Sequence, residues 1–212
     1  DAGGLGLPDR DYYLKKDARS VETRQRYLEH VAKMFELLGD APKAAKANAA
    51  TVLRIETALA NASLTKVGRR GPHKIYHRHT MKTLPKVAPG FDWQGYFSAV
   101  GLNPQPWLND TLPAFFKELN ARLSKESLKD LKTYLRWSLV DATADYLASP
   151  FVNEQFAFYR QYLRGAEADR PRWKKCVAWV DRDLGEALGR EFVARTFPAT
   201  MKEKTVTMTH QI

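Results

Sequence analysis

The segments DARSVETRQRYLEHVAKMFELL (residues 17–38) and APKAAKANAATVLRIETALANA (residues 41–62) decide the fold class. In the first segment, apolar residues recur every third or fourth position with charged residues between them: Leu28, Val31, Phe35 and Leu38. This spacing matches the 3.6-residue period of an α-helix with one apolar face. The first segment is therefore predicted to be an amphipathic helix.

The second segment repeats the pattern with smaller side chains, and its apolar face consists of Ala45, Ala49, Val52, Ile55 and Leu59. Gly39 and Pro42 end the first helix, and Asp40 is a suitable N-cap for the second. Because only a short turn separates them, the two helices are predicted to form an antiparallel hairpin over about residues 17–62.

The remaining sequence continues as helices after one interruption. Glycine and proline break the pattern over about residues 63–109, leaving room for short helices near Thr80–Leu84 and from Asp92 to Val100. Helices are predicted again over about 110–212, with caps at Asp110 and Ser124, an aromatic-rich helix from Phe151 to Leu163, and a long helix from Pro171. No long alternating stretch competes, so we expect an all-α, multi-helix, bundle-like domain spanning residues 1–212.

Two later helices carry long apolar stripes that we expect to face the core. The first stripe is Leu128, Leu131, Leu135, Leu139, Ala142 and Tyr146, and the second is Trp173, Val177, Val180, Leu184, Leu188 and Phe192. Trp137, Phe156 and Phe158 also occupy positions where core residues are expected.

Composition excludes several classes of protein. The single cysteine, Cys176, excludes an internal disulfide framework and a multi-cysteine zinc site, and its place beside Val177 favours a buried thiol over a nucleophile. The longest apolar run is too short to cross a bilayer. Because the chain begins with Asp1 and no signal segment follows, we expect a processed form or a piece of a longer protein.

Three histidines form the most suggestive local group, in GPHKIYHRHT (residues 71–80). His73, His77 and His79 could share a metal ion if the segment were extended at 77–79 and turned back at 73. Cations such as Arg70 lie nearby, and no carboxylate lies within the group to balance their charge. The alternative, that the three histidines are exposed loop residues, is therefore favoured. His30, in the middle of its helix, is expected to be a surface or boundary residue.

The formal net charge is +10, which permits a nucleic-acid partner. However, basic pairs such as Lys15–Lys16, Arg69–Arg70 and Lys174–Lys175 are spread along the chain instead of concentrated on one helix. A solvated basic surface is therefore favoured. Asp181 and Asp183 are two positions apart on a helix and cannot easily act as an acid–base pair on one substrate.

Several motifs resemble the neprilysin family of zinc metallopeptidases. GLGLPDRDYYL (residues 4–14) is similar to the family's G-L-G-L-P-x-R-D-Y-Y segment, and LANAS (residues 59–63) followed by Arg69–Arg70 is similar to its next block. RWKKCV (residues 172–177) and ALGREFV (residues 187–193) are similar to its R-W-(K/R)-(K/R)-C helix and the sequel. The resemblance spans the chain in the family's order. Two features depart from the family's pattern: Gly71, where the family commonly has Asp, and the three histidines.

The resemblance implies a fragment: most of the helical lid lobe that gates peptide access to a catalytic chamber. In the family, H-E-x-x-H and a later E-x-x-x-D hold zinc and the catalytic glutamate in a C-terminal lobe, and this sequence contains no H-E-x-x-H. The resemblance therefore implies no catalytic residue here, no cofactor in this chain, zinc in the parent enzyme, and a secreted, periplasmic or membrane-anchored parent.

We expect the principal partner of this chain to be the missing catalytic lobe. We also expect the chain to self-associate through the apolar surface that this lobe would cover. Two alternatives stay open. The chain could be a stand-alone hydrolase of phosphate or sulfate esters, using the histidines or nearby arginines, or a basic nucleic-acid-binding helical module.

Overall fold

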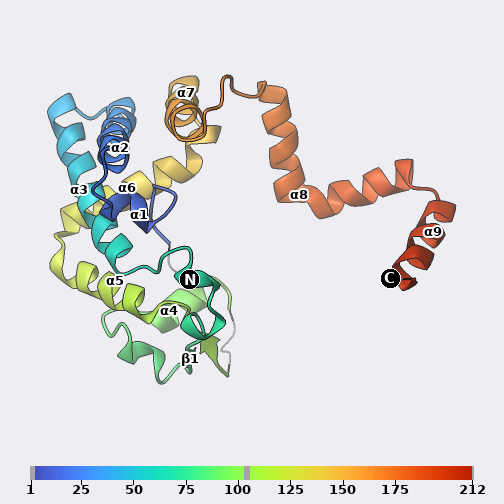
Figure 1. Cartoon of the computed structure of the whole chain (residues 1–212), viewed down its shortest axis with the longest axis horizontal. Helices are drawn as coiled ribbons and strands as arrows, with labels where there is room; N and C mark the ends of the chain where they lie inside the picture. Colours follow the sequence, from blue (N-terminus) through green and yellow to red (C-terminus); the bar gives the residue numbers. More distant parts are fainter. Residues whose placement is uncertain (1–2, 103–105, 212) are drawn as a thin grey trace. The chain divides into compact units, whose positions relative to one another are not determined.

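A computed structural model describes residues 3–102 and 106–211. The chain divides into two compact units, residues 1–165 and 166–212, which are described separately below. The expectation of one domain over residues 1–212 stays a prediction. The helices of the first unit are α1 (Arg10–Leu14), α2 (Ala18–Leu37), α3 (Pro42–Asn61), α4 (Trp93–Ala99), α5 (Pro113–Lys125), α6 (Leu128–Thr143) and α7 (Ser149–Gln155) (Figure 1).

The all-α prediction is confirmed. The only sheet among the described residues is one antiparallel pair of two-residue strands, β1 (Arg78–His79) and β2 (Leu108–Asn109). Short 3-10 turns at Gly68–Arg70, Pro72–Lys74, Leu84–Lys86 and Ala144–Tyr146 fill the connections.

The helical hairpin is confirmed as α2 and α3. Asp17 caps α2 by accepting the N–H of Ser20, and Gly39 makes the turn with φ +94°, a conformation that side chains with a Cβ rarely adopt. The N-cap of α3 is Ala41, so the prediction for Asp40 was wrong. The Asp40 carboxylate instead accepts hydrogen bonds from Asn48 and from Arg136 of α6, because those donors lie within reach in the folded unit.

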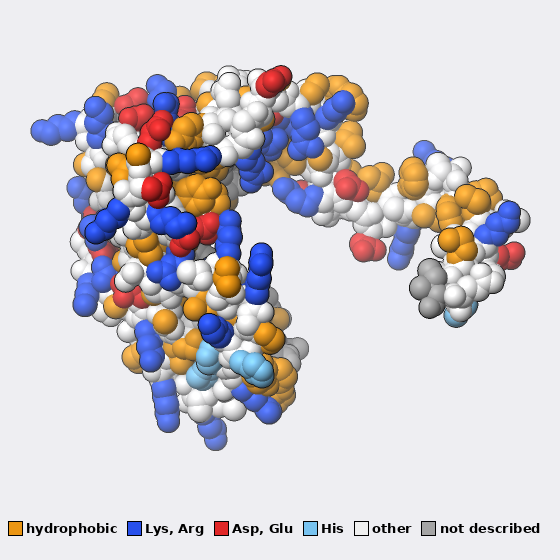
Figure 2. All heavy atoms as spheres, in the orientation of Figure 1, with side chains coloured by type: hydrophobic (Ala, Val, Ile, Leu, Met, Phe, Trp, Pro, Cys, Tyr) orange, Lys and Arg blue, Asp and Glu red, His pale blue; other side chains and the backbone are white. Residues whose placement is uncertain are grey.

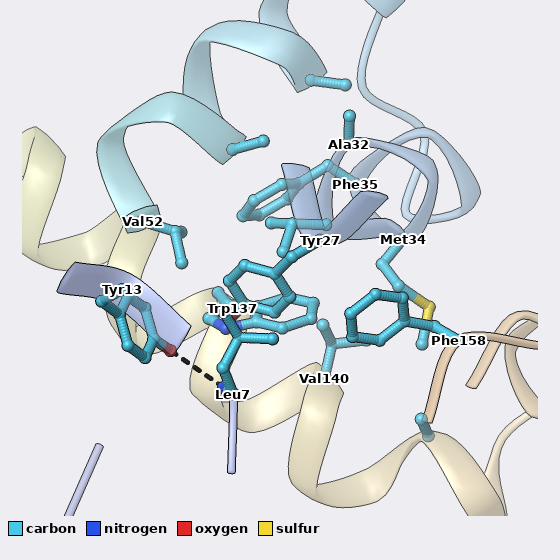
Figure 3. Close-up of a cluster of buried hydrophobic side chains, with 14 of the residues drawn as sticks. Leu7, Tyr13, Tyr27, Ala32, Met34, Phe35, Val52, Trp137, Val140 and Phe158 are labelled. Atoms are coloured by element: carbon cyan, nitrogen blue, oxygen red, sulfur yellow. Dashed lines mark hydrogen bonds between the residues drawn. The ribbon is translucent and has the colours of Figure 1, made fainter. Parts of the chain in front are cut away.

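The main core lies where α1, α2, α3, α6 and the segment after α7 meet. Trp137 of α6 packs against Tyr27 of α2 with ring centroids 5.9 Å apart, and Phe158 packs against Tyr27 at 5.7 Å. Figure 3 shows these rings together with Leu7, whose N–H donates to the hydroxyl of Tyr13. A segment near the amino terminus is thus tied into the centre of the unit.

Helix α6 turns a different face to the core from the one predicted. Its buried residues are Thr133, Trp137 and Val140, whereas Leu128, Leu135 and Leu139 of the predicted stripe are exposed. Both rows have helical spacing, so periodicity alone does not choose between them. Trp137 decides the face because its ring packs against Tyr27 and Phe35 of α2.

The predicted caps and short helices are confirmed only in part. The helix predicted from Asp92 to Val100 is present as α4, whereas the one predicted near Thr80–Leu84 is a turn followed by a 3-10 segment. Ser127, not Ser124, caps α6, and Leu112 is the N-cap of α5. Asp110 lies two residues earlier and accepts the N–H of Leu112 at 2.9 Å.

The predicted aromatic helix over 151–163 is α7 continued by a π-helical segment, Phe156–Tyr162. Of its two predicted core aromatics, Phe158 is buried and Phe156 is half-buried. Gly165, with φ +71°, follows the segment.

The second unit consists of α8 (Arg172–Thr196) and α9 (Ala199–His210). Helix α8 starts after Pro171, as predicted, and bends at Leu184, where φ −129° and ψ 19° leave the helical region. Asp169 pairs with the buried ammonium of Lys175. The prediction that one stripe of α8 faces the core was wrong. The six residues of this stripe are 41–64% exposed: Trp173, Val177, Val180, Leu184, Leu188 and Phe192. Cys176, expected to be buried, is half-buried.

In the part of the chain that the structure describes, no helix combines the length and apolar character needed to cross a bilayer.

Candidate functional site

The three histidines do not converge on one point. His73 is exposed in a 3-10 turn, and His79 lies on β1 opposite Leu108. His77 Nδ1 lies 2.9 Å from the backbone oxygen of Asp110, and because a carbonyl oxygen only accepts, this nitrogen carries the proton. Among the described residues, no group of three or more His, Cys, Asp or Glu side chains has an arrangement that could hold a metal ion. A metal site at His73, His77 and His79 stays a prediction of the sequence.

A buried carboxylate, that of Glu56, lies at the centre of the first unit. The residue is 1% exposed and sits on α3 in register with Val52 and Leu59. Its oxygens accept hydrogen bonds from the hydroxyls of Tyr13 and Tyr27 at 2.8 Å.

Two further donors complete the shell around Glu56. Trp137 Nε1 donates at 3.1 Å, and the backbone N–H of Gly6 donates at 3.3 Å. A Cβ on Gly6 would collide with the Tyr27 hydroxyl, so the close approach of this backbone requires glycine. One carboxylate therefore joins α1, α2, α3, α6 and the GLGLP segment.

Burial raises the pKa of the Glu56 carboxyl to about 7, because removal from water disfavours the charged form. The hydrogen bonds from Tyr13, Tyr27 and Trp137 oppose this effect by stabilising the carboxylate. Since the group is sealed from solvent and surrounded by donors, it positions helices and has no access to a substrate.

A second polar group, His30, lies beside this network. The sequence predicted a surface or boundary residue, but His30 is 2% exposed, so that prediction was wrong. Its Nδ1 lies 2.8 Å from an oxygen of Glu154 on α7, and its ring stacks on Phe158 with centroids 4.7 Å apart. Its partner is 124 residues away in sequence, which left no local sign of burial.

A pocket of about 480 Å³ opens beside α4 and α5. Its wall consists largely of aromatic rings, including Trp93 and Phe97 of α4 and Phe116 of α5. Asp110 contributes a carboxylate that is 3% exposed. The sequence pattern marked Asp110 only as a helix cap and did not mark the pocket.

Basic side chains are distributed over the surface and many have acidic partners. Figure 2 shows lysine and arginine side chains dispersed among acidic and apolar ones on the visible face. Arg54 pairs with Glu126 at 2.6 Å and with Asp130 at 3.3 Å, and Arg122 pairs with Glu118 at 2.8 Å. This distribution agrees with the solvated basic surface that the sequence favours.

Comparison with known proteins identifies the family of this chain. The family model for the amino-terminal region of peptidase family M13 matches residues 1–212. The chain belongs to peptidase family M13. The resemblance to neprilysin-like zinc metallopeptidases is therefore confirmed.

Relatives of this M13 chain include endothelin-converting enzyme 1 of Rattus norvegicus, which is 30% identical over 209 residues. That match covers 95% of this chain and 27% of the relative. The zinc metalloprotease Zmp1 of Mycobacterium tuberculosis in an open state superposes with a TM-score of 0.91 at 32% identity, over 98% of this chain and 32% of Zmp1. Zmp1 in complex with an inhibitor gives a TM-score of 0.86 at 32% identity, over 96% and 31%.

The M13 chain thus spans about a third or less of the length of these relatives. Neither the ester hydrolase nor the nucleic-acid module is supported by these comparisons.

Proposed function

We propose that this chain is the helical lid of an M13 zinc metallopeptidase and that it controls the access of peptides to a catalytic chamber completed by the rest of the enzyme. On this proposal the chain contributes shape and steric exclusion and does not cleave peptides alone. The missing catalytic lobe is its principal partner, and peptides are the substrates of the whole enzyme.

The match to Zmp1 carries the proposal. This chain superposes on about a third of Zmp1 both in the open state and in the inhibitor complex, with TM-scores of 0.91 and 0.86. A region that keeps one fold in both structures is suited to move as a rigid body. The buried Glu56 network supplies such rigidity here, because it joins four helices through hydrogen bonds to one side chain.

The exposed rows on α6 and α8 support a partner for this chain. Leu128, Leu135 and Leu139 lie on one exposed row of α6, and Trp173, Leu184 and Phe192 are exposed on α8. Figure 2 shows apolar side chains on the visible surface of the second unit. Apolar rows of this kind are typical of surfaces that another protein segment covers.

The resemblance to neprilysin-like enzymes further supports an extracytoplasmic site of action, which belongs to the same proposal. Zinc and its ligands belong to the rest of the enzyme and not to the residues described here.

Gating is tested in the complete enzyme that carries this chain. Leu135→Ser and Leu139→Ser place hydroxyls on the exposed row of α6 and leave its buried face intact. If this row holds the lid closed, these variants raise kcat/KM for a long peptide relative to a short one. Val21→Ser, at an exposed apolar position on α2, is the control.

An unchanged ratio of the two kcat/KM values in both α6 variants, with helical content intact, contradicts gating through this row. An equal change in Val21→Ser would assign the effect to general surface polarity and would also contradict the proposal.

A further inference from the structure

The net charge of this chain is concentrated in one stretch of the first unit. Between Glu56 and Asp92 the sequence has no acidic residue and seven basic ones, which are Lys66, Arg69, Arg70, Lys74, Arg78, Lys82 and Lys86. These residues supply +7 of the formal net charge of +10, so the cations in the rest of the chain are largely balanced by acidic residues. Residues 66–86 are hereafter called the basic segment.

The cations of the basic segment are exposed, and most of them lack a carboxylate partner. All seven basic residues are exposed. Lys66 pairs with Asp9 at 2.9 Å, and the guanidinium of Arg78 lies 5.2 Å from the centroid of the Trp107 ring. Among the described residues, the other five cations form no ion pair: Arg69, Arg70, Lys74, Lys82 and Lys86. The segment therefore presents uncompensated positive charge to the solvent.

Short turns and a strand hold several of these like charges close together. Two consecutive 3-10 turns contain Arg69, Arg70 and Lys74. Arg78 is fixed on β1 by its antiparallel pairing with Asn109. Figure 2 shows lysine and arginine side chains around the histidines near β1. Because this scaffold keeps like charges near one another, an anionic partner would relieve their repulsion.

Apolar side chains are exposed beside these cations. Val67 immediately precedes the first of the two turns and is 74% exposed, the highest fraction among the large apolar side chains of the described residues. Tyr76 is 55% exposed, and Trp107, beneath Arg78, is 42% exposed. Tyrosine and tryptophan favour the boundary between water and lipid, because an apolar ring carries a polar atom that can reach water.

We propose that the basic segment docks the first unit on an anionic lipid surface. Its cations contact the phosphates of the headgroups, and Val67, Tyr76 and Trp107 enter the boundary between headgroups and acyl chains. The combination of charge and apolar side chains selects this partner, because a nucleic acid would match the charge but would leave Val67 in water. This docking is separate from the gating role and does not depend on it.

Co-sedimentation of the 212-residue chain with lipid vesicles tests the docking. The chain is expected to bind vesicles that mix phosphatidylcholine with phosphatidylglycerol, and not vesicles of phosphatidylcholine alone. Added salt is expected to weaken this binding, because ions screen exposed charges. Equal binding to both kinds of vesicle, or no binding to the anionic vesicles at low salt, overturns the proposal.

Two matched double variants locate the contact. Arg69→Gln with Arg70→Gln should weaken binding to the anionic vesicles about thirtyfold, because each basic residue near such a surface contributes about a factor of five. Lys43→Gln with Lys46→Gln removes the same charge from exposed positions at the opposite end of α3 from the basic segment, and should weaken binding by less than about twofold. Equal losses in the two double variants contradict docking through this segment.

Val67→Ser distinguishes a lipid surface from another polyanion. It should weaken binding to the anionic vesicles severalfold, because the hydroxyl loses the gain from leaving water, whereas Val21→Ser on α2 should leave binding unchanged. Unchanged vesicle binding in Val67→Ser overturns the proposal. Tighter binding of a single-stranded oligonucleotide than of these vesicles would assign the segment to nucleic acid and would overturn it as well.

Discussion

At the scale of single residues, Glu56 is the centre of the first unit. Its carboxylate receives hydrogen bonds from Tyr13, Tyr27 and Trp137, which come from three different helices. Each of these donors is buried, so removal of the acceptor would leave several polar groups without partners. The positions of α1, α2 and α6 around α3 therefore depend on one side chain.

The raised pKa of Glu56 makes stability depend on pH. Its ordinary pKa is 4.5 and its pKa in the folded chain is about 7, so the folded chain holds the proton more tightly than the unfolded chain. Stability from this group is fully present below about pH 4.5 and is lost as pH rises through about 7. The loss is on the order of 3 kcal/mol at most.

Glu56→Gln removes this dependence because the amide does not titrate. Urea unfolding followed between about pH 5 and about pH 8 should show the wild-type free energy of unfolding falling relative to that of the variant. Glu22→Gln, at an exposed position on α2, should run parallel to the wild type. If the wild-type and Glu56→Gln curves are parallel instead, the raised pKa is wrong.

Trp137 and Trp173, both predicted from the sequence to be core residues, should respond differently to substitution. Trp137→Phe removes ring volume and the hydrogen bond to Glu56, and should lower the free energy of unfolding by about 2–3 kcal/mol. Trp173→Phe changes an exposed side chain and should change it by less than about 0.5 kcal/mol. Similar losses in chemical denaturation would contradict the assigned core.

Sequence reasoning found the environment of these residues only in part. Glu56 is in register with the apolar stripe of its helix, and this charged residue on an apolar face was a usable signal. Its donors Tyr13, Tyr27 and Trp137 lie 43, 29 and 81 residues away, so no local pattern linked them to it. The pocket around Asp110 was hidden for the same reason.

At the scale of elements, the helical hairpin was predictable and the orientation of α6 was not. Helices α2 and α3 each have one apolar stripe and clear stop signals, so their sequences define both extent and face. Helix α6 has one row with Leu135 and Leu139 and another with Trp137 and Val140. Only packing against α2 and α3 selects the second row, and packing is a property of the folded chain.

The face of α6 is tested by neighbouring substitutions. Val140→Ala leaves a cavity in the core and should lower the free energy of unfolding by about 2 kcal/mol. Leu139→Ala removes more side chain from an exposed position and should change it by less than about 0.5 kcal/mol. Midpoints of thermal unfolding in the reverse order would restore the stripe first predicted from periodicity.

At the scale of the whole molecule, exposed apolar rows should make the isolated chain associate with itself. The rows include Leu135 and Leu139 on α6 and Val177 and Leu188 on α8. Light scattering after size-exclusion chromatography should show a mass that rises with concentration, together with binding of an apolar dye. Leu135→Lys with Leu139→Lys should reduce both signals. A monomer at all concentrations that binds no dye would contradict this expectation.

On the proposed function, this M13 chain is a helical lid, and the zinc chemistry belongs to the rest of the enzyme. The most direct test measures bound zinc and peptide cleavage together in the purified 212-residue chain, with zinc supplied and then removed by a chelator. No stoichiometric zinc and no turnover of peptides are expected in either condition. Zinc bound at one ion per chain, with peptide cleavage that the chelator abolishes, would contradict it.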